Sequence, residues 1–246
     1  MAALESLAGF AASPVLEARL RRAAALAEAC RDIRPDVDEP HWAALLDAVT
    51  VQETRLFRHP AQCAAAAALL PAGLAAARAG GRPFRMLSAG CATGEEAFTL
   101  AALAQHATRE APGAAVEVLG LDLCRPALAS AASGAIAPGM GEPLALVPPA
   151  LRSWFEDASG QIRLHPRLRR MLRFERRNLL GWADEGLDAI FCRNVLIYLT
   201  EPARIAVTAA LCAALRPGGL LALGPTDRPP AGMVARGESL WTAPDG

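Results

Sequence analysis

Short apolar runs alternate with helical patterns in the chain from residue 84 onward. The runs have the length of buried strands, and they span 84–88, 116–121, 187–192 and 220–223. Amphipathic patterns after the first three runs predict helices at 94–106, 126–132 and 202–215. Strands that alternate with helices form a parallel sheet covered on both faces. The pattern therefore predicts an α/β protein with a doubly wound, mostly parallel sheet.

The chain is expected to have three parts. Residues 1–48 contain helical patterns and no strand pattern, so they are predicted to form a short helical N-terminal region. Residues 49–60 link this region to the main domain, which extends over 61–246. Residues 138–175 interrupt the alternation, and we interpret them as a small inserted β subdomain. Its expected elements are a helix near 151–155 and strands at 161–164 and 172–175.

Two helices are predicted within the N-terminal region. The first begins at Ser13 and Pro14, which are a typical N-cap and first helical residue. Its apolar face is formed by Leu16, Leu20, Ala23, Ala24 and Ala27. The second helix covers residues 41–48.

Composition excludes several classes of function. Acidic and basic residues balance at 25 each, which argues against broad nucleic-acid binding, because such binding needs a basic surface. The six cysteines form no C-x-x-C pair and the four histidines are scattered, so we expect reduced thiols and no metal site. No secretory pattern and no uninterrupted apolar stretch of ~18 residues is present. We therefore expect a cytoplasmic protein that does not insert into membranes.

A turn of small residues follows the first predicted strand, and the next helix begins with Glu95 and Glu96. Small residues let a ligand approach the backbone, and open α/β sheets bind ligands beyond the carboxyl ends of their strands. The turn lacks the G-x-G-x-x-G pattern of dinucleotide sites, and two acids would repel a pyrophosphate. This favours a cationic cofactor such as S-adenosylmethionine over NAD. Alternatively, both acids only complement the helix dipole.

Asp122 ends the second predicted strand. An acid at this place binds ribose hydroxyls in nucleotide-binding α/β folds. Alternatively, Asp122 caps the helix that begins near Pro126. The residue pattern leaves both roles open.

Five segments carry a more specific signal. They are T-V-Q-E-T-R-L-F-R at 50–58, S-A-G-C-A-T-G-E-E at 88–96, G-L-D-L at 120–123, N-L-L at 178–180 and F-C-R-N-V-L-I-Y at 191–198. In this order and spacing the chain resembles the chemotaxis-receptor methyltransferases, the CheR family, over about residues 42–224. The resemblance implies a Rossmann-like enzyme that uses S-adenosylmethionine to esterify glutamate side chains of methyl-accepting chemotaxis or chemosensory receptors. The implied partners are the acidic cytoplasmic helices of such receptors.

The resemblance also implies a role for each matching residue. Gln52, Thr54 and Arg58 would lie across the cofactor from the sheet, near its methyl group. The other implied contacts are Gly90 and Glu96 at the methionine and ribose end, Asp122 at the ribose, Asn178 and Leu179 at the adenine, and Arg193, Asn194 and Tyr198 facing the methyl group. The family has Asn where this chain has Gln52.

Arg58, Tyr198 and Arg193 are the candidate catalytic residues. A glutamate carboxylate has a pKa of about 4.3 and is ionised at neutral pH, so it needs no general base. Catalysis would depend on in-line alignment, and Arg58 could hold the carboxylate through two charge-assisted bonds. The hydroxyl of Tyr198 could orient the same carboxylate, or the ring could serve only packing. Arg193 either acts in catalysis or ties the strand end to the motif by an ion pair, with Asp122 as the candidate partner.

The N-terminal region departs from the family pattern because it is short. Leu20, Arg21 and Arg22 resemble the start of the basic helix that faces the receptor in the family. With Arg19, the two arginines could instead form a solvated helix face. The short region and Gln52 keep two other functions open. One is a relative that binds the cofactor or a signalling partner without turnover, and the other is a methyltransferase for another protein or a small molecule.

Overall fold

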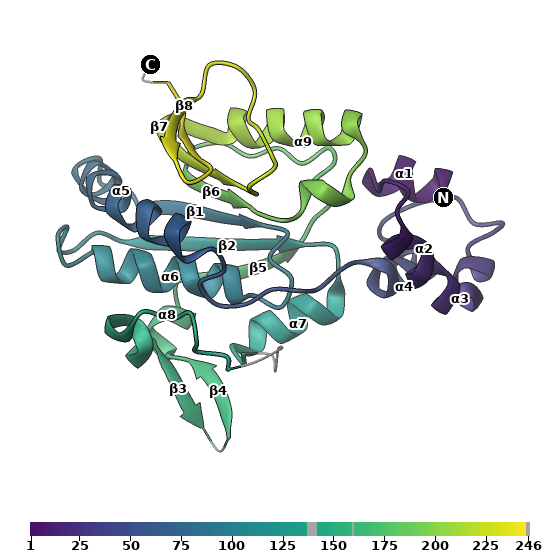
Figure 1. The fold of residues 1–246 in the computed structure, drawn as a ribbon, viewed down its shortest axis with the longest axis horizontal. Coiled ribbons are helices and arrows are strands. Elements are labelled where there is room, and N and C mark those ends of the chain that lie inside the picture. Colours follow the sequence, from purple (N-terminus) through teal and green to yellow (C-terminus); the bar gives the residue numbers. More distant parts are fainter. Residues whose placement is uncertain (137–141, 159, 245–246) are drawn as a thin grey trace.

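A computed structural model describes residues 1–136, 142–158 and 160–244, and it shows a seven-stranded sheet between layers of helices (Figure 1). The strand order is β5 (Leu172–Arg176), β2 (Val116–Asp122), β1 (Phe84–Ala89), β6 (Leu187–Cys192), β7 (Leu215–Leu223), β9 (Leu240–Thr242) and β8 (Val234–Gly237). The first five strands are parallel, and β9 and β8 add an antiparallel edge. The predicted doubly wound, mostly parallel α/β fold is confirmed.

Helices cover both faces of this sheet. In the main domain they are α5 (Pro60–Ala79), α6 (Glu95–Ala107), α7 (Arg125–Ser133), α8 (Pro166–Arg169) and α9 (Glu201–Ala214). Phe84 and Met86 of β1 pack into the core that contains α5 and α6. Leu87 and Ala89 point the other way and pack with α9, as the two-residue period of a strand requires.

The chain order of the strands reverses at β1. Strands β2 and β5 lie on one side of β1, whereas β6 and β7 lie on the other. Open α/β sheets bind ligands in the crevice at such a switch point, beyond the carboxyl ends of the strands. The fold alone therefore points to the ends of β1 and β6.

The N-terminal region forms a small helical unit with its own apolar core. Its helices are α1 (Ala2–Ala8), α2 (Pro14–Arg22), α3 (Ala24–Ala29) and α4 (Pro40–Val49). Ser13 caps α2 as predicted, since its hydroxyl accepts a hydrogen bond from the amide of Leu16. The single helix expected through Ala27 is broken at Ala23, whose backbone leaves the helical range and separates α2 from α3.

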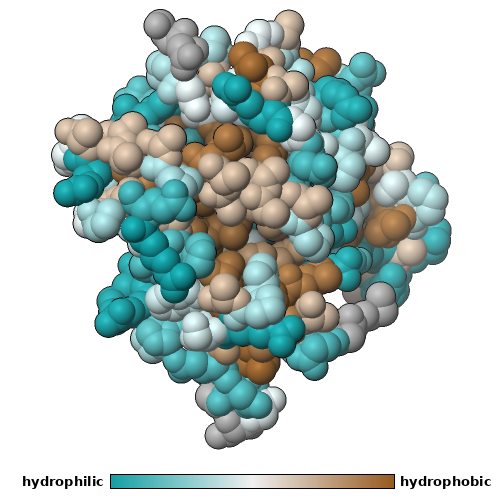
Figure 2. All heavy atoms as spheres, turned by 60° about the vertical axis from the view of Figure 1, so that its left-hand side comes forward, coloured by the Kyte–Doolittle hydropathy of each residue, from teal (hydrophilic) through white to brown (hydrophobic). Residues whose placement is uncertain are grey.

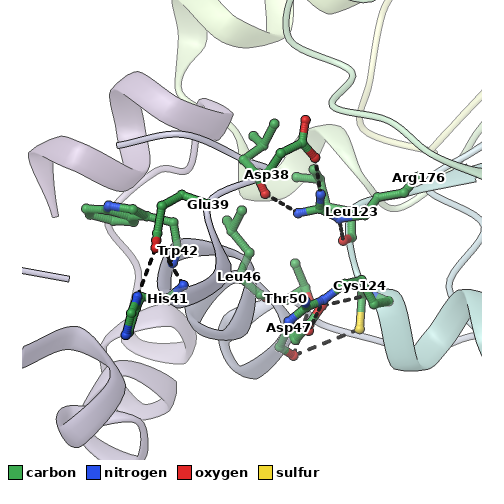
Figure 3. A network of polar contacts seen from close by, with 12 residues as sticks. Asp38, Glu39, His41, Trp42, Leu46, Asp47, Thr50, Leu123, Cys124 and Arg176 are labelled. Atoms are coloured by element: carbon green, nitrogen blue, oxygen red, sulfur yellow. Dashed lines mark hydrogen bonds and ion pairs between the residues drawn. The ribbon is translucent and has the colours of Figure 1, made fainter. Parts of the chain in front are cut away.

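Polar contacts hold this helical unit against the carboxyl edge of the sheet (Figure 3). The carboxylate of Asp47 accepts hydrogen bonds from the backbone amide and the side chain of Arg125, the first residue of α7. Arg176, at the end of β5, extends to the carboxylate of Asp38 and to the carbonyls of Val37 and Leu123. The helical unit thus reaches two neighbouring strand ends of the main domain.

The predicted insert is smaller than expected. Its hairpin consists of β3 (Phe155–Ala158) and β4 (Gln161–Leu164), preceded by a short 3-10 helix, η1 (Pro149–Trp154). The segment predicted as its last strand is instead β5, which pairs in parallel with β2 as the edge of the main sheet. Residues 138–141, where the insert was expected to begin, lie outside the described residues.

Helix α5 is, among the described residues, the one helix long and apolar enough to cross a membrane by length and composition. Its buried face, which includes Leu70 and Leu74, packs in the main core against α6 and β1. A third of the candidate span is buried, so one face of the helix packs in the core and the rest is more open. Figure 2 turns the left-hand side of Figure 1 forward, where α5 lies, and shows apolar residues in the middle of this face with hydrophilic residues around them.

A buried ion pair joins the amino ends of β1 and β6. Asp188 accepts two hydrogen bonds from the guanidinium of Arg82, at 2.6 and 2.7 Å, and a third from the backbone amide of Arg85. Its side chain is 8% exposed. The exposed pair of Glu28 and Arg31 has the same 2.6 Å distance, but its side chains are 61% and 68% exposed.

We expect Asp188→Ala to lower the free energy of unfolding by roughly 2–4 kcal/mol, because it leaves a partly buried cation and an amide without their acceptor. Glu28→Ala should change it by less than about 0.5 kcal/mol, because exposed pairs contribute little. Urea unfolding of both variants measures the difference. Equal losses would mean that burial does not determine the contribution of these pairs.

Candidate functional site

A cleft opens at the switch point between β1 and β6, and the N-terminal helical unit forms its opposite wall. Ten of the eleven residues that the sequence predicts for the site line this cleft. They are Thr54, Arg58, Gly90, Glu96, Asp122, Asn178, Leu179, Arg193, Asn194 and Tyr198. These residues come from five separate segments of the chain, and the fold brings them to one place.

Gly90 makes the turn after β1 possible. Its φ is +78°, and a Cβ added there would lie 2.4 Å from Cγ2 of Val195. Only glycine lets the backbone take this conformation so close to the loop that follows β6. The turn after β1 and the loop after β6 both carry cleft residues. Gly90 therefore lets these two segments lie against each other at the cleft.

A buried ion pair forms part of the cleft wall. The Nε of Arg193 donates to a carboxylate oxygen of Glu96 at 2.7 Å, and the other oxygen accepts from the hydroxyl of Ser88 at 2.7 Å. Burial alone would lower the pKa of Arg193, but the adjacent Glu96 raises it above its usual value. The alternative structural role of Arg193 therefore has geometric support, with Glu96 as its partner in place of Asp122.

The same guanidinium also holds the segment that carries Arg58. Its Nη1 donates to the backbone carbonyl of Arg58 and to the side-chain carbonyl of Gln62. Gln62 in turn donates to the carbonyls of Leu223 and Ser239, near the end of β7. Arg193 thus connects the end of β6 to the loop that lies across the cleft.

Glu95 does not share the position of Glu96. Its side chain is buried outside the cleft lining and accepts a hydrogen bond from Thr93. The expectation that both acids face a cationic cofactor was wrong, because successive helical residues point about 100° apart. The negative charge of Glu96 is moreover matched by Arg193, so Asp122 becomes the more informative acid.

The carboxylate of Asp122 organises the bottom of the cleft. It accepts hydrogen bonds from the backbone amides of Ala92 at 2.8 Å and Cys124 at 2.9 Å. Burial raises the pKa of Asp122, and these hydrogen bonds oppose that shift. Asp122 does not cap α7, since the first amide of that helix, Arg125, is bound by Asp47. A carboxylate has about four acceptor positions, so Asp122 retains capacity toward a ligand.

Gln52 is the predicted site residue that the fold turns away from the cleft. Its amide group donates to the backbone carbonyl of Asp47 and to the sulfur of Cys124. The loop that contains it, residues 51–59, is not helical, so the helical spacing considered for Thr54 and Arg58 does not apply. Both residues nevertheless reach the cleft, where Arg58 also donates to the carbonyl of Glu53.

Two asparagines hold the loops at the rim. Asn178 donates to the carbonyl of Leu7 at 2.7 Å and accepts from the amide of Leu180. Asn194 has a φ of +59°, and its side-chain Oδ1 lies 3.3 Å from Nε2 of His59. Burial and the neighbouring arginines lower the pKa of His59, and its side chain lies outside the cleft lining.

Part of the cleft wall is formed by residues that the sequence pattern does not predict. Residues from α1, α2 and the connection between them line the cleft, namely Ala8, Phe10, Ala11, Ser13, Val15 and Leu16. Glu53, beside Thr54, lines it as well. Residues 9–12 show no periodic pattern, and the contacts depend on how the helical unit docks, which no local signal encodes.

Buried thiols surround these groups. Cys91 lies between two cleft residues, Gly90 and Ala92, and burial together with the charges of Asp122 and Glu96 raises its pKa well above the usual value. Burial also raises the pKa of Cys63, close to Arg193. Within the described parts of the chain, no group of three His, Cys, Asp or Glu side chains is placed to hold a metal ion.

The cleft suits S-adenosylmethionine by the chemistry of its lining. Phe10, Val15 and Leu179 offer apolar surface to an adenine ring. The carboxylate of Asp122 can accept from the two ribose hydroxyls. The turn at Gly90 leaves backbone close to the ligand.

Comparison with known proteins agrees with this chemistry. Residues 52–235 match the family model described as CheR methyltransferase, SAM binding domain. The chain is 37% identical over 189 residues to the probable biofilm formation methyltransferase WspC of Pseudomonas putida, covering 75% of this chain and 43% of that protein. It is 30% identical over 212 residues to the chemotaxis protein methyltransferase of Vibrio parahaemolyticus, covering 83% of this chain and 74% of that protein. With chemotaxis protein methyltransferase 1 of Pseudomonas aeruginosa it shares 32% identity over 195 residues, which are 74% of this chain and 68% of the relative.

Proposed function

This chain belongs to the CheR methyltransferase family, and we propose that it is an S-adenosylmethionine-dependent O-methyltransferase that esterifies glutamate side chains of methyl-accepting receptor proteins. The observation that carries the proposal is the convergence of ten predicted site residues on one cleft. Gln52, which together with the short N-terminal region suggested an inactive relative, lies outside that cleft. Its side chain therefore forms no part of the lining.

The residues of the cleft divide between holding the cofactor and receiving the substrate. When bound, S-adenosylmethionine supplies an electrophilic methyl group on a positively charged sulfur. Asp122 would hold the ribose, Asn178 and Leu179 would border the adenine, and Gly90 would admit the methionine part. Thr54, Asn194 and Glu96 would complete the binding site.

The substrate glutamate needs alignment more than activation. A carboxylate with a pKa of about 4.3 is already a nucleophile at neutral pH. Arg58 can hold it through two parallel hydrogen bonds, and Tyr198 can orient it through its hydroxyl. In-line positioning of this kind can be worth ~7–11 kcal/mol. Arg193 would act through Arg58, as a positioning residue, because its guanidinium is occupied by Glu96 and the 58–62 segment.

The partner would be an acidic receptor helix in the cytoplasm. Arg21 and Arg22 are exposed on α2, where Arg21 lies 4.0 Å from Glu17 and Arg22 donates to the carbonyl of Ala18, so both can still reach a partner from solvent. Arg19 is different, since it donates to the carbonyl of Thr50 at the end of α4. Of the three arginines, we therefore assign receptor contact to Arg21 and Arg22.

Two measurements test the proposed function. Calorimetry should detect binding of S-adenosylmethionine and of its demethylated product, and no binding of NAD or ATP. Tritiated methyl transfer to membranes from the source cell should give a label that alkali releases, because a glutamate methyl ester is alkali-labile. Tighter binding of NAD would contradict the cofactor assignment, and an alkali-stable label would contradict the ester.

We expect Arg58→Lys to bind the cofactor normally but to transfer the methyl group about a hundredfold more slowly, which corresponds to ~3 kcal/mol. Lysine keeps the charge and loses the planar fork that holds a carboxylate. Single-turnover transfer at saturating cofactor measures this effect. Arg55→Lys is the matched control, because it makes the same change on the same loop at an exposed residue outside the cleft lining. A parent-like rate in Arg58→Lys would move the alignment role to Tyr198.

We expect the double variant Arg21→Glu/Arg22→Glu to raise the KM for the receptor without changing cofactor affinity. Added salt should raise the KM of the parent protein in the same direction, because it screens exposed charges. Arg78→Glu/Arg109→Glu is the control. It changes the net charge equally at two exposed residues near the ends of α5 and α6, at the opposite edge of the sheet. An equal KM for both double variants would show that α2 does not contact the receptor.

A further inference from the structure

The connection between α1 and α2 is joined to the loop that carries Tyr198. The amide of Ala11 donates to the carbonyl of Tyr198, and the amide of Thr200 donates to the carbonyl of Gly9, both at 2.8 Å. Between them, Phe10 and Leu199 form an antiparallel bridge. The two hydrogen bonds of this short ladder thus flank Leu199 and fix the backbone directly after the Cα of Tyr198, although the two segments are nearly 190 residues apart in the sequence.

Gly9 allows this contact to be as close as it is. Its φ is +72°, and an added Cβ would lie 2.5 Å from the Cβ of Ala203 in the first turn of α9. Figure 1 shows α1 beside this end of α9. The segment therefore lies directly on the helix that follows the Tyr198 loop.

The same segment also holds the second loop of the cleft. The side-chain amide of Asn178 donates to the carbonyl of Leu7 at 2.7 Å. Phe10 packs against both the α9 core and the core of the N-terminal unit, and it lines the cleft together with Ala8 and Ala11. Residues 7–11, named here the N-terminal strap, thus touch the loop at Asn178 and the loop at Tyr198 at once.

We infer that the N-terminal strap is a positioning element for methyl transfer, which sets the Tyr198 loop and closes the cleft over the cofactor. The inference rests on the proposed function. It has a physical reason, because the strap binds the backbone carbonyl of Tyr198, and loss of that bond would let the backbone shift and carry the side chain with it. A displacement of about 1 Å can cost ~10²-fold in rate when catalysis depends on alignment.

The strap and the cofactor should stabilise each other. Whatever binds the docked form better than the detached form shifts the protein toward the docked form. Since strap residues line the cleft, a ligand in the cleft gains contacts only while the strap is docked. Hydrogen exchange at the amides of Ala11 and Thr200, the two ladder donors, should therefore slow when S-adenosylhomocysteine is added.

Gly9→Ala tests the inference in the full chain. Alanine meets both an unfavourable φ and the Cβ of Ala203, so it should push the strap off α9. Gly81→Ala is the matched control, because Gly81 has a similar φ of +65° but open space where the Cβ would lie. The double variant Gly9→Ala/Ala203→Gly removes the contact and keeps the backbone strain, with Ala203→Gly alone as its reference.

Calorimetry with S-adenosylhomocysteine, single-turnover transfer and melting are measured for all four variants. We expect Gly9→Ala to lose about tenfold or more in rate and affinity, and its ladder amides to exchange faster. Gly81→Ala should lower only the melting temperature, and the double variant should recover most of the loss. If Gly9→Ala matches Gly81→Ala in rate, affinity and exchange, the strap is only structural and the inference is overturned. If the parent protein neither binds S-adenosylhomocysteine nor transfers a methyl group, the proposed function itself fails.

Discussion

The ion pair of Glu96 and Arg193 is the contact on which the site depends. It joins the start of α6 to the end of β6, across the switch point of the sheet. Both side chains are nearly inaccessible to water, and such a pair is costly to break because one buried charge would be left without its partner. Arg193 also binds the backbone carbonyl of Arg58. The ion pair, which lies in the wall of the cleft, therefore helps to fix the position of the 51–59 loop.

Most of the main domain could be predicted from the sequence because its central strands, β1 and β6, are largely buried on both faces. Strand β6 is buried at every residue and is apolar except at Asp188, so it stands out as an apolar run, and its predicted bounds agree with those observed. Edge strand β5 was assigned to the insert because its arginines and glutamate interrupt the apolar pattern. Its place in the main sheet is determined by pairing with β2, which only the folded chain reveals.

The sequence predicted the cleft residues that lie at strand ends. It missed those whose position depends on how the N-terminal helical unit docks on the main domain. Gly90, Asp122 and Arg193 lie at strand ends, so their position follows from the fold class. Gln52 carries the right functional group, but the docked helical unit offers it the carbonyl of Asp47. The apolar wall at Phe10 belongs to a connection with no periodicity, and it exists only because two separately packed units meet. Contacts between two units with separate cores depend on the surfaces of both folded units. The residue pattern of a single segment does not encode them.

The burial of the cysteines has a consequence for the selectivity of the chemistry. Sulfur is a better nucleophile toward carbon than a carboxylate, but only as the thiolate. Cys91 adjoins the cleft residues in the chain, and its raised pKa keeps it protonated near neutrality. Nearby Cys63 is buried too, and burial raises its pKa as well. A protein that holds an alkylating agent is thus protected from methylating its own thiols by the same carboxylates and apolar packing that build its binding site.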